Sequence, residues 1–167
     1  MNKDKIIIYT DGAAKGNPGK AGWAAVILFS QNYGGPGHAH EIGDRVEHAT
    51  NNQMELTAPI EALKYLRKYK DTQATPVYDI EIVSDSKYVI LGITEWIFNW
   101  QKNNWRNAAK KPVLNHELWE ELCKLNIELK PKWTYVKGHN GDKYNDRADL
   151  IATSFAEGFP VKLKDAR

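Results

Sequence analysis

Lys5-Ile6-Ile7-Ile8-Tyr9-Thr10-Asp11-Gly12 is a β-branched, apolar run that stops at an acid and a glycine. A second run of this kind, Ile80-Glu81-Ile82-Val83-Ser84-Asp85-Ser86, also stops at an acid followed by a small residue. Both runs are typical of β-strands, and each places an aspartate at the C-terminal tip of its strand. Because strand tips from distant parts of a chain meet at one edge of a sheet, Asp11 and Asp85 are candidates for a shared site.

The pattern around these runs indicates strands first and then a mixture of helices and strands. Further strands are expected over residues 22–30, 41–48 and 132–137, and helices over 51–69, 86–99 (broken), 116–128 and 142–156. Residues 12–19 indicate a tight turn, and Pro59 should kink its helix or cost it a hydrogen bond. We predict an α/β sheet with helices on its faces, in a single domain over residues 1–167 with a core of about 5–156 and a tail of 157–167.

The composition limits the possible classes without choosing a function. The chain has 167 residues, 42% of them hydrophobic, and a net charge of +2, so charge alone neither demands nor excludes a nucleic-acid partner. No stretch approaches the roughly 20 apolar residues of a membrane span, and the first residues do not resemble a signal peptide. The single cysteine, Cys123, rules out an internal disulfide and fits a reducing compartment. We therefore expect a cytoplasmic protein that binds no membrane.

Four acids at the expected strand ends and within the expected helices are candidate ligands for divalent cations: Asp11, Glu55, Asp85 and Asp149. Hard cations prefer oxygen ligands, and phosphoryl transfer by two metal ions needs several carboxylates. Each acid also has an ordinary explanation. An aspartate beside a small residue can be a turn residue, and Glu55 can interact with the helix dipole. Asp149 can pair with Arg147 or Lys143. Spacing alone leaves both interpretations open.

The sequence segments around these acids are more specific indicators of a protein family than the acids themselves. Asn51-Asn52-Gln53-Met54-Glu55, Ser84-Asp85-Ser86-Lys87-Tyr88 and Asn145-Asp146-Arg147-Ala148-Asp149 resemble signature segments of the type 1 ribonuclease H family. Further matching words follow in the family's order at residues 10–13, 16–19, 92–97, 110–113, 117–119 and 136–139. The resemblance runs from about Lys5 to Ala156, which is nearly the whole chain.

This resemblance implies a ribonuclease H-like fold, a mixed five-stranded sheet with helices on both faces. It implies an endonuclease that hydrolyses the RNA strand of an RNA/DNA hybrid and leaves 5′-phosphate and 3′-hydroxyl ends. Two Mg²⁺ ions, for which Mn²⁺ can substitute, would be bridged by Asp11. Asp149 would help hold the ion that activates water, and Glu55 and Asp85 would help hold the other.

At the matched position His139, the resemblance implies an accessory role in proton handling and product departure. A lone histidine between glycine-containing segments is otherwise more often a surface residue. The other histidines lack such a context, and we assign them no role.

Between Glu95 and Glu117 the sequence contains cations and tryptophans but no acid. The resemblance implies a basic protrusion that contacts the DNA strand, with candidate residues Trp96, Trp100, Lys102, Arg106, Lys110 and Lys111. The alternative is a solvated segment whose tryptophans belong to the core. Candidates near the RNA are Gly12, Ala13, Asn17 and Asn52, and Thr50, Asn51 and Trp100 are candidates on the DNA side. The polar members of these sets can equally be capping residues.

Three other functions are alternatives to this one. The same fold hosts transposases, integrases and exonucleases, so the fold does not determine the substrate. A catalytically dead hybrid-binding module would gain nothing from acids crowded beside a polyanion. A calcium-binding protein would need a compact ligand loop, and the sequence has none. We expect a monomer that needs no protein partner.

Overall fold

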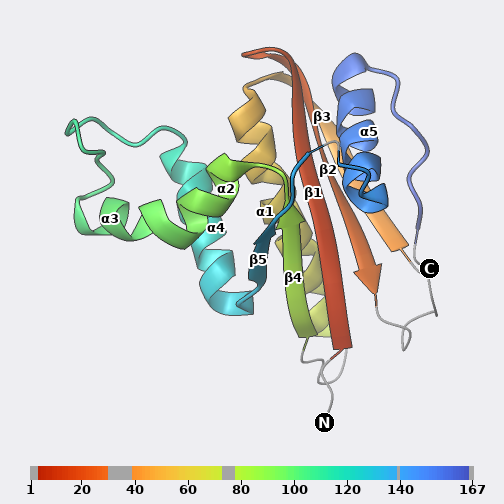
Figure 1. Cartoon of the computed structure of the whole chain (residues 1–167), viewed down its shortest axis with the longest axis horizontal. Helices are drawn as coiled ribbons and strands as arrows, with labels where there is room; N and C mark the ends of the chain where they lie inside the picture. The colour runs from red at the N-terminus through yellow and green to blue at the C-terminus, as the bar shows by residue number, and fades with distance from the viewer. Residues whose placement is uncertain (1–3, 30–38, 73–77, 139, 166–167) are drawn as a thin grey trace.

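The computed structural model describes residues 4–29, 39–72, 78–138 and 140–165. Five strands within these residues form one mixed sheet in the order β3-β2-β1-β4-β5 (Figure 1). The strands are β1 (Asp4–Gly16), β2 (Gly19–Phe29), β3 (Ala39–Ala49), β4 (Tyr78–Ser84) and β5 (Lys132–Tyr135). The helices are α1 (Asn51–Thr72), α2 (Lys87–Leu91), α3 (Ile97–Lys102), α4 (His116–Leu129) and α5 (Lys143–Glu157), with a π-helical turn, η2 (Gly92–Trp96), between α2 and α3.

Strand β1 has two neighbours that differ in length. It runs parallel to β4 only as far as the pair Thr10↔Ser84, but antiparallel to β2 as far as Gly16↔Gly19. The expected turn over residues 12–19 is therefore too long. Residues 12–16 find hydrogen-bond partners in β2 and stay in the strand, and the turn is confined to Asn17 and Pro18. Asp11 consequently lies inside β1, at the point where β4 stops beside it. Asp85 directly follows β4, as predicted.

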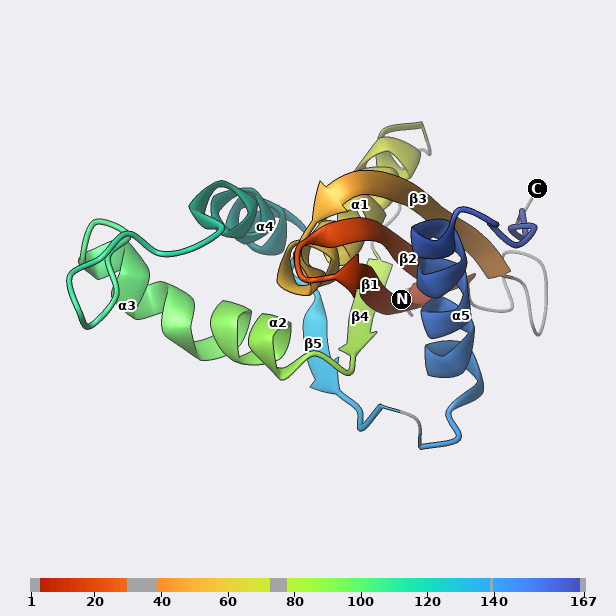
Figure 2. The ribbon, with the colours of Figure 1, turned by 90° about the horizontal axis from the view of Figure 1, so that it is seen from above.

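Helices cover both faces of the sheet, which confirms the predicted fold class. Side chains of β1 alternate between the two faces, as the period of a strand requires. Ile6 and Ile8 pack with Leu56 and Leu63 of α1, while Tyr9 of the same strand packs with α5. Helices α1 and α5 accordingly lie on opposite faces, and α4 lies beside α1 (Figure 2).

Helix α1 begins with a reciprocal cap and runs through its proline. The Thr50 hydroxyl accepts the Gln53 N–H at 3.1 Å, and the Gln53 side chain accepts the Thr50 N–H at 2.8 Å. The helix continues past Pro59 to Thr72. Because proline has no N–H, the Glu55 carbonyl loses its usual helical donor. Of the two expected effects of Pro59, the lost hydrogen bond is the one that its chemistry imposes.

The segment after α5 is fixed to the sheet by a buried ion pair. Arg147 donates two hydrogen bonds of 2.8 Å to Glu41 on β3, whose side chain is only 3% exposed. Glu41 also accepts the Lys164 N–H at 2.9 Å, and its own N–H donates to the Lys164 carbonyl at 2.8 Å. Val161 packs on the core between α5 and the sheet. Arg147 therefore pairs with Glu41, the residue that also binds the tail, and it is not the partner of Asp149.

None of the helices in the described ranges is long and apolar enough to cross a membrane.

Candidate active site

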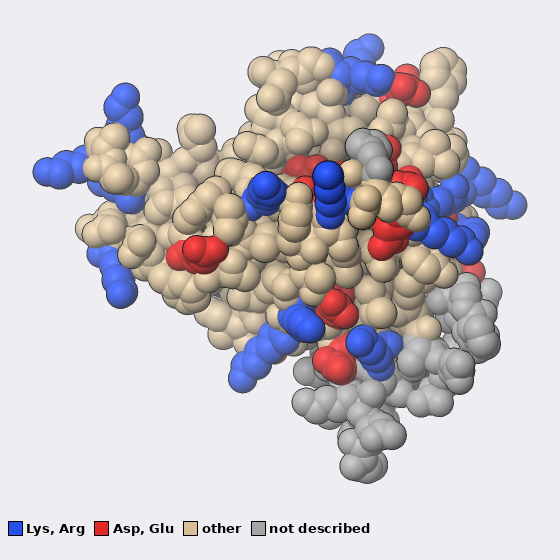
Figure 3. Space-filling model, viewed as in Figure 1, with Lys and Arg blue, Asp and Glu red and all other residues tan. Residues whose placement is uncertain are grey.

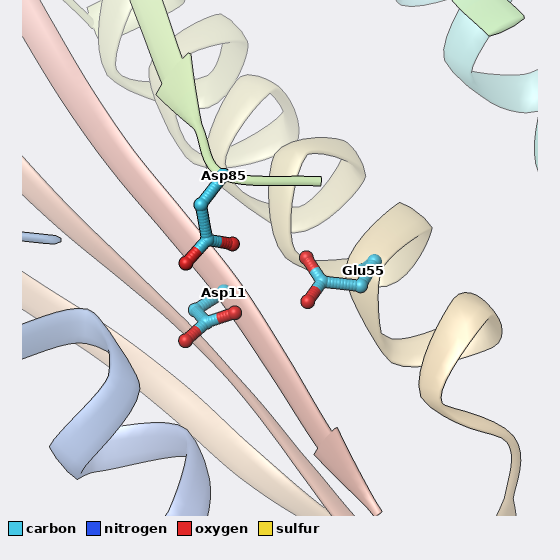
Figure 4. A group of neighbouring side chains, drawn as sticks. All are labelled: Asp11, Glu55 and Asp85. Carbon is cyan, nitrogen blue, oxygen red and sulfur yellow. The ribbon is translucent and has the colours of Figure 1, made fainter. Parts of the chain in front are cut away.

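Three carboxylates meet where β4 ends beside β1. Asp11 comes from β1, Asp85 follows β4, and Glu55 lies on the second turn of α1 (Figure 4). One oxygen from each side chain lies within 4.8 Å of the oxygens of the other two. Asp11 and Glu55 are 4% and 5% exposed, so two acidic side chains are buried together. We call these three residues the carboxylate cluster.

Two glycines let the backbone approach the cluster closely. A Cβ on Gly12 would stand 2.5 Å from the Glu55 nitrogen, so α1 can sit directly on β1 only because this position has no side chain. A Cβ on Gly138 would stand 2.9 Å from Asp85 Oδ2. The Gly12 N–H donates to Asp11 Oδ1 at 2.9 Å and orients that carboxylate. The glycine after Asp11 therefore places two members of the cluster.

Burial and mutual repulsion change the acidity of the cluster. Burial raises the pKa of Asp11 to about 7; hydrogen bonds from Glu55 and the Gly12 N–H act in the opposite direction, and the charges of Asp85 and Asp149 add to the increase. Burial also raises the pKa of Glu55 well above its ordinary value, and the charge of Asp11 reinforces this. The metal-free cluster therefore retains protons that isolated carboxylates would release.

The donor set fits a divalent cation. Glu55 Oε2 is buried and has no hydrogen-bond partner among the described residues. A buried acceptor without a donor is unfavourable, and a cation would satisfy it. Three hard oxygen ligands at this spacing suit Mg²⁺ or Mn²⁺ better than a softer metal.

Asp149 and His139 stand apart from this cluster for different reasons. Asp149 lies half-buried on α5, near enough for its charge to raise the pKa of Asp11, but it is not among the three residues whose oxygens lie within 4.8 Å. The structure thus brings three of the four candidate ligands together and leaves Asp149 at longer range. His139 lies outside the described residues.

Asn145 also lies at the site, although its sequence context did not mark it as a candidate. It stands in the first turn of α5 and is 1% exposed. Its Nδ2 lies 3.4 Å from Asp85 Oδ2. Its position four residues before Asp149 was a usable signal, because residues at that spacing share a helix face.

Candidate residues for contact with both strands of a hybrid gather near Asp11 and the start of α1. Asn17 lies in the connection between β1 and β2, and its Oδ1 accepts the Asn51 N–H at 3.0 Å. Asn51 and Asn52 are exposed, whereas Gly12 is buried and Ala13 half-buried. Thr50 does cap α1, as the alternative interpretation held. The cap is formed by Thr50 and Gln53 and does not involve the exposed side chains of Asn51 and Asn52. Those two side chains remain candidates for contact with a ligand.

Residues 97–115 project from the body of the protein, and we call them the basic protrusion. Lysines and arginines gather at its left end in Figure 3, over α3 and the loop that follows. All four candidate cations are exposed: Lys102, Arg106, Lys110 and Lys111.

The tryptophans of this region serve two purposes. Trp96 is 38% exposed, whereas Trp100 is half-buried and meets the buried Trp119 edge-on, with 5.3 Å between ring centroids. Trp96, Trp100, Arg106 and three asparagines line a hollow of about 260 Å³. The tryptophans therefore join the core on one side and line a surface hollow on the other, while contact with a DNA strand stays a prediction.

Comparison with known sequences identifies relatives along nearly the whole chain. The profile of the family described as RNase H matches residues 3–157. A ribonuclease H of Thermosynechococcus vestitus is 49% identical over 157 residues, which cover 94% of this chain and 92% of that protein. A ribonuclease HI of Pseudomonas aeruginosa is 42% identical over 151 residues, covering 90% of this chain and 93% of that protein.

Solved structures give the same result. LC9-RNase H1, described as a type 1 RNase H with the type 2 active-site motif, shares the fold with a TM-score of 0.80 at 24% identity, covering 99% of this chain and 79% of that one. LC11-RNase H1, solved in complex with an RNA/DNA hybrid, has a TM-score of 0.67 at 26% identity and covers 92% of this chain and 97% of that one. On the family match and these relatives together, this chain belongs to the RNase H family of hydrolases.

Proposed function

We propose that this protein is an endonuclease that hydrolyses the RNA strand of RNA/DNA hybrids with two divalent metal ions, leaving 5′-phosphate and 3′-hydroxyl ends. The observation that carries the proposal is the carboxylate cluster, in which the buried Glu55 Oε2 has no hydrogen-bond partner within the described part of the chain. Membership of the RNase H family supports the reaction class, and the complex of LC11-RNase H1 with a hybrid supports the substrate. We expect one catalytic domain over residues 1–167, acting as a cytoplasmic monomer.

Asp11, Glu55 and Asp85 would hold Mg²⁺ together with Asp149, and Mn²⁺ would substitute. Ions held there would supply Lewis-acid chemistry, lowering the pKa of an attacking water and stabilising charge on the leaving 3′ oxygen. The resemblance to the family implies that Asp11 would help hold both ions, and Asp85 and Asp149 both lie near enough for their charges to raise the pKa of Asp11. Binding of cations would release the protons that Asp11 and Glu55 retain. His139 would handle protons as the product departs.

The basic protrusion would hold the DNA strand of the hybrid. Its exposed cations match a phosphate backbone, and the hollow between its tryptophans offers an apolar surface for sugars. The exposed amides of Asn17 and Asn52, with the backbone around Gly12 and Ala13, would contact the RNA strand near the carboxylate cluster. Thr50 and Asn51 would contact the DNA strand from the start of α1.

A gel assay with labelled substrates tests this function. An RNA/DNA hybrid should be cut in Mg²⁺, whereas single-stranded RNA, duplex RNA and duplex DNA should stay intact. Asp11→Asn should lose nearly all activity, while Asp79→Asn, which removes an exposed acid from β4, should cut like the parent. Equal activity of parent and Asp11→Asn would contradict the proposal, and binding of the hybrid without cleavage by the parent would favour a dead hybrid-binding module.

A further inference from the structure

Asn145 is a buried amide whose nitrogen has a hydrogen-bond partner and whose oxygen has none among the described residues. Its Nδ2 lies 3.4 Å from Asp85 Oδ2, while its Oδ1 has no partner among the residues that the structure describes. The side chain is 1% exposed. An unpaired buried carbonyl is costly, so its retention beside a carboxylate calls for a ligand that donates a hydrogen bond.

The first turn of α5 holds this residue rigidly. Asp142 caps the helix, and its carboxylate accepts the backbone N–H groups of Tyr144 at 3.0 Å and Asn145 at 3.2 Å. Asp149 lies one turn further along the same helix face, and its charge reaches Asp11. The face that carries Asn145 and Asp149 is therefore directed to the carboxylate cluster.

We propose that Asn145 is a positioning residue that orients Asp85 through Nδ2 and, through Oδ1, accepts a hydrogen bond from a water molecule in the cation site. This inference rests on the proposed metal-dependent function. A neutral amide suits the position because it can donate to a carboxylate and accept from water at once, whereas a carboxylate in its place would only accept. Through this contact α5 and β4 are joined at the site itself, so that Asp85 and Asp149 face the same cations.

A purely structural role for Asn145 is the competing explanation, and the chain provides a matched control for it. The pair of Glu41 and Arg147 fastens the same helix to β3 with two hydrogen bonds of 2.8 Å, and Glu41 is not part of the carboxylate cluster. Glu41→Gln should therefore weaken the attachment of α5 and lower the melting temperature without altering the affinity for metal.

The test measures metal binding without nucleic acid, by calorimetric titration of the full-length protein with Mn²⁺. Asn145→Ala should raise the Kd about 10-fold, the lower end of what loss of such a supporting contact costs. Asn145→Asp, which keeps the shape but removes the donor to Asp85, should also shift the Kd, and it provides the test if the alanine variant fails to fold. Glu41→Gln should bind Mn²⁺ like the parent.

The possible results separate this inference from the proposed function. If the parent binds Mn²⁺ and cuts the hybrid while both Asn145 variants bind Mn²⁺ with the parent's Kd, the inference fails and the function stands. If Glu41→Gln weakens Mn²⁺ binding as much as Asn145→Ala does, Asn145 only attaches α5 and the inference also fails. A parent that binds no metal would overturn both.

Discussion

Replacing Asp11 by asparagine should stabilise the metal-free protein at neutral and alkaline pH. Burial raises the pKa of Asp11 from its ordinary 3.8 to about 7. At 1.36 kcal/mol for each pH unit, that difference corresponds to about 4 kcal/mol of destabilisation when the group is fully ionised. Asparagine removes the charge but is still a buried polar side chain, and Glu55 would then ionise more readily. The expected net gain in the free energy of unfolding is therefore about 1–2 kcal/mol.

The stability of the parent should fall as the pH rises, and this determines at which pH the variant is the more stable protein. Because the folded-state pKa is raised, the unfolded chain releases its proton first as the pH increases above 3.8, and the parent loses stability until the pH passes about 7. The advantage of Asp11→Asn should thus be absent near pH 4 and complete at pH 8. Bound Mg²⁺ stabilises the parent more than the variant and should therefore reduce the stability advantage of Asp11→Asn.

Thermal unfolding in EDTA at pH 4, 6 and 8, and again with Mg²⁺, measures this effect. Asp79→Asn is the matched control, since it removes an exposed acid outside the cluster and should melt like the parent at every pH. An Asp11→Asn protein that melts below the parent at pH 8 in EDTA would refute the reasoning. So would a gain of the same size at pH 4.

Three further outcomes are expected. Neutralising the four cations of the basic protrusion together should raise KM and flatten its dependence on salt with little change in kcat, and an unchanged salt dependence would mean that they face away from the substrate. His139→Ala should lower kcat roughly 10- to 100-fold, because water can take over part of a proton-transfer role; a loss as complete as that of Asp11→Asn would make His139 indispensable instead. Glu41→Gln should lower the melting temperature, since one partner of a buried ion pair is left unmatched, and an unchanged value would show that the tail contributes no stability.

The sequence predicted the elements whose signals are local. The strand before Asp85 and its end at Ser84 follow from a short β-branched run closed by polar residues, and the structure confirms this end. The last helix, expected over residues 142–156, follows from its apolar spacing. In the structure it spans Lys143–Glu157, and Asp142 is its cap. The apolar and polar spacing of neighbouring residues is enough to define such elements.

The sequence failed where the deciding partner is distant. β1 extends beyond Asp11 because β2 offers it partners, and the glycines of that segment indicate a turn only when β2 is ignored. Glu41 is an acid buried within a strand, where Arg147, 106 positions later, pairs with it. Asn145 was missed for the same reason, since its contact with Asp85 spans 60 positions. Carboxylates could be recognised as candidates from their type, but only the fold identifies the three that meet.

The central claim is that the carboxylate cluster holds the metal ions that act on the hybrid. Anomalous diffraction from crystals of the parent protein with Mn²⁺ and a hybrid carrying an uncleavable linkage tests it most directly. The account predicts two anomalous peaks, both in contact with Asp11, one of them also in contact with Glu55 and Asp85 and the other with Asp149. Peaks away from these side chains, or a bound hybrid with no peak at the cluster, would contradict it.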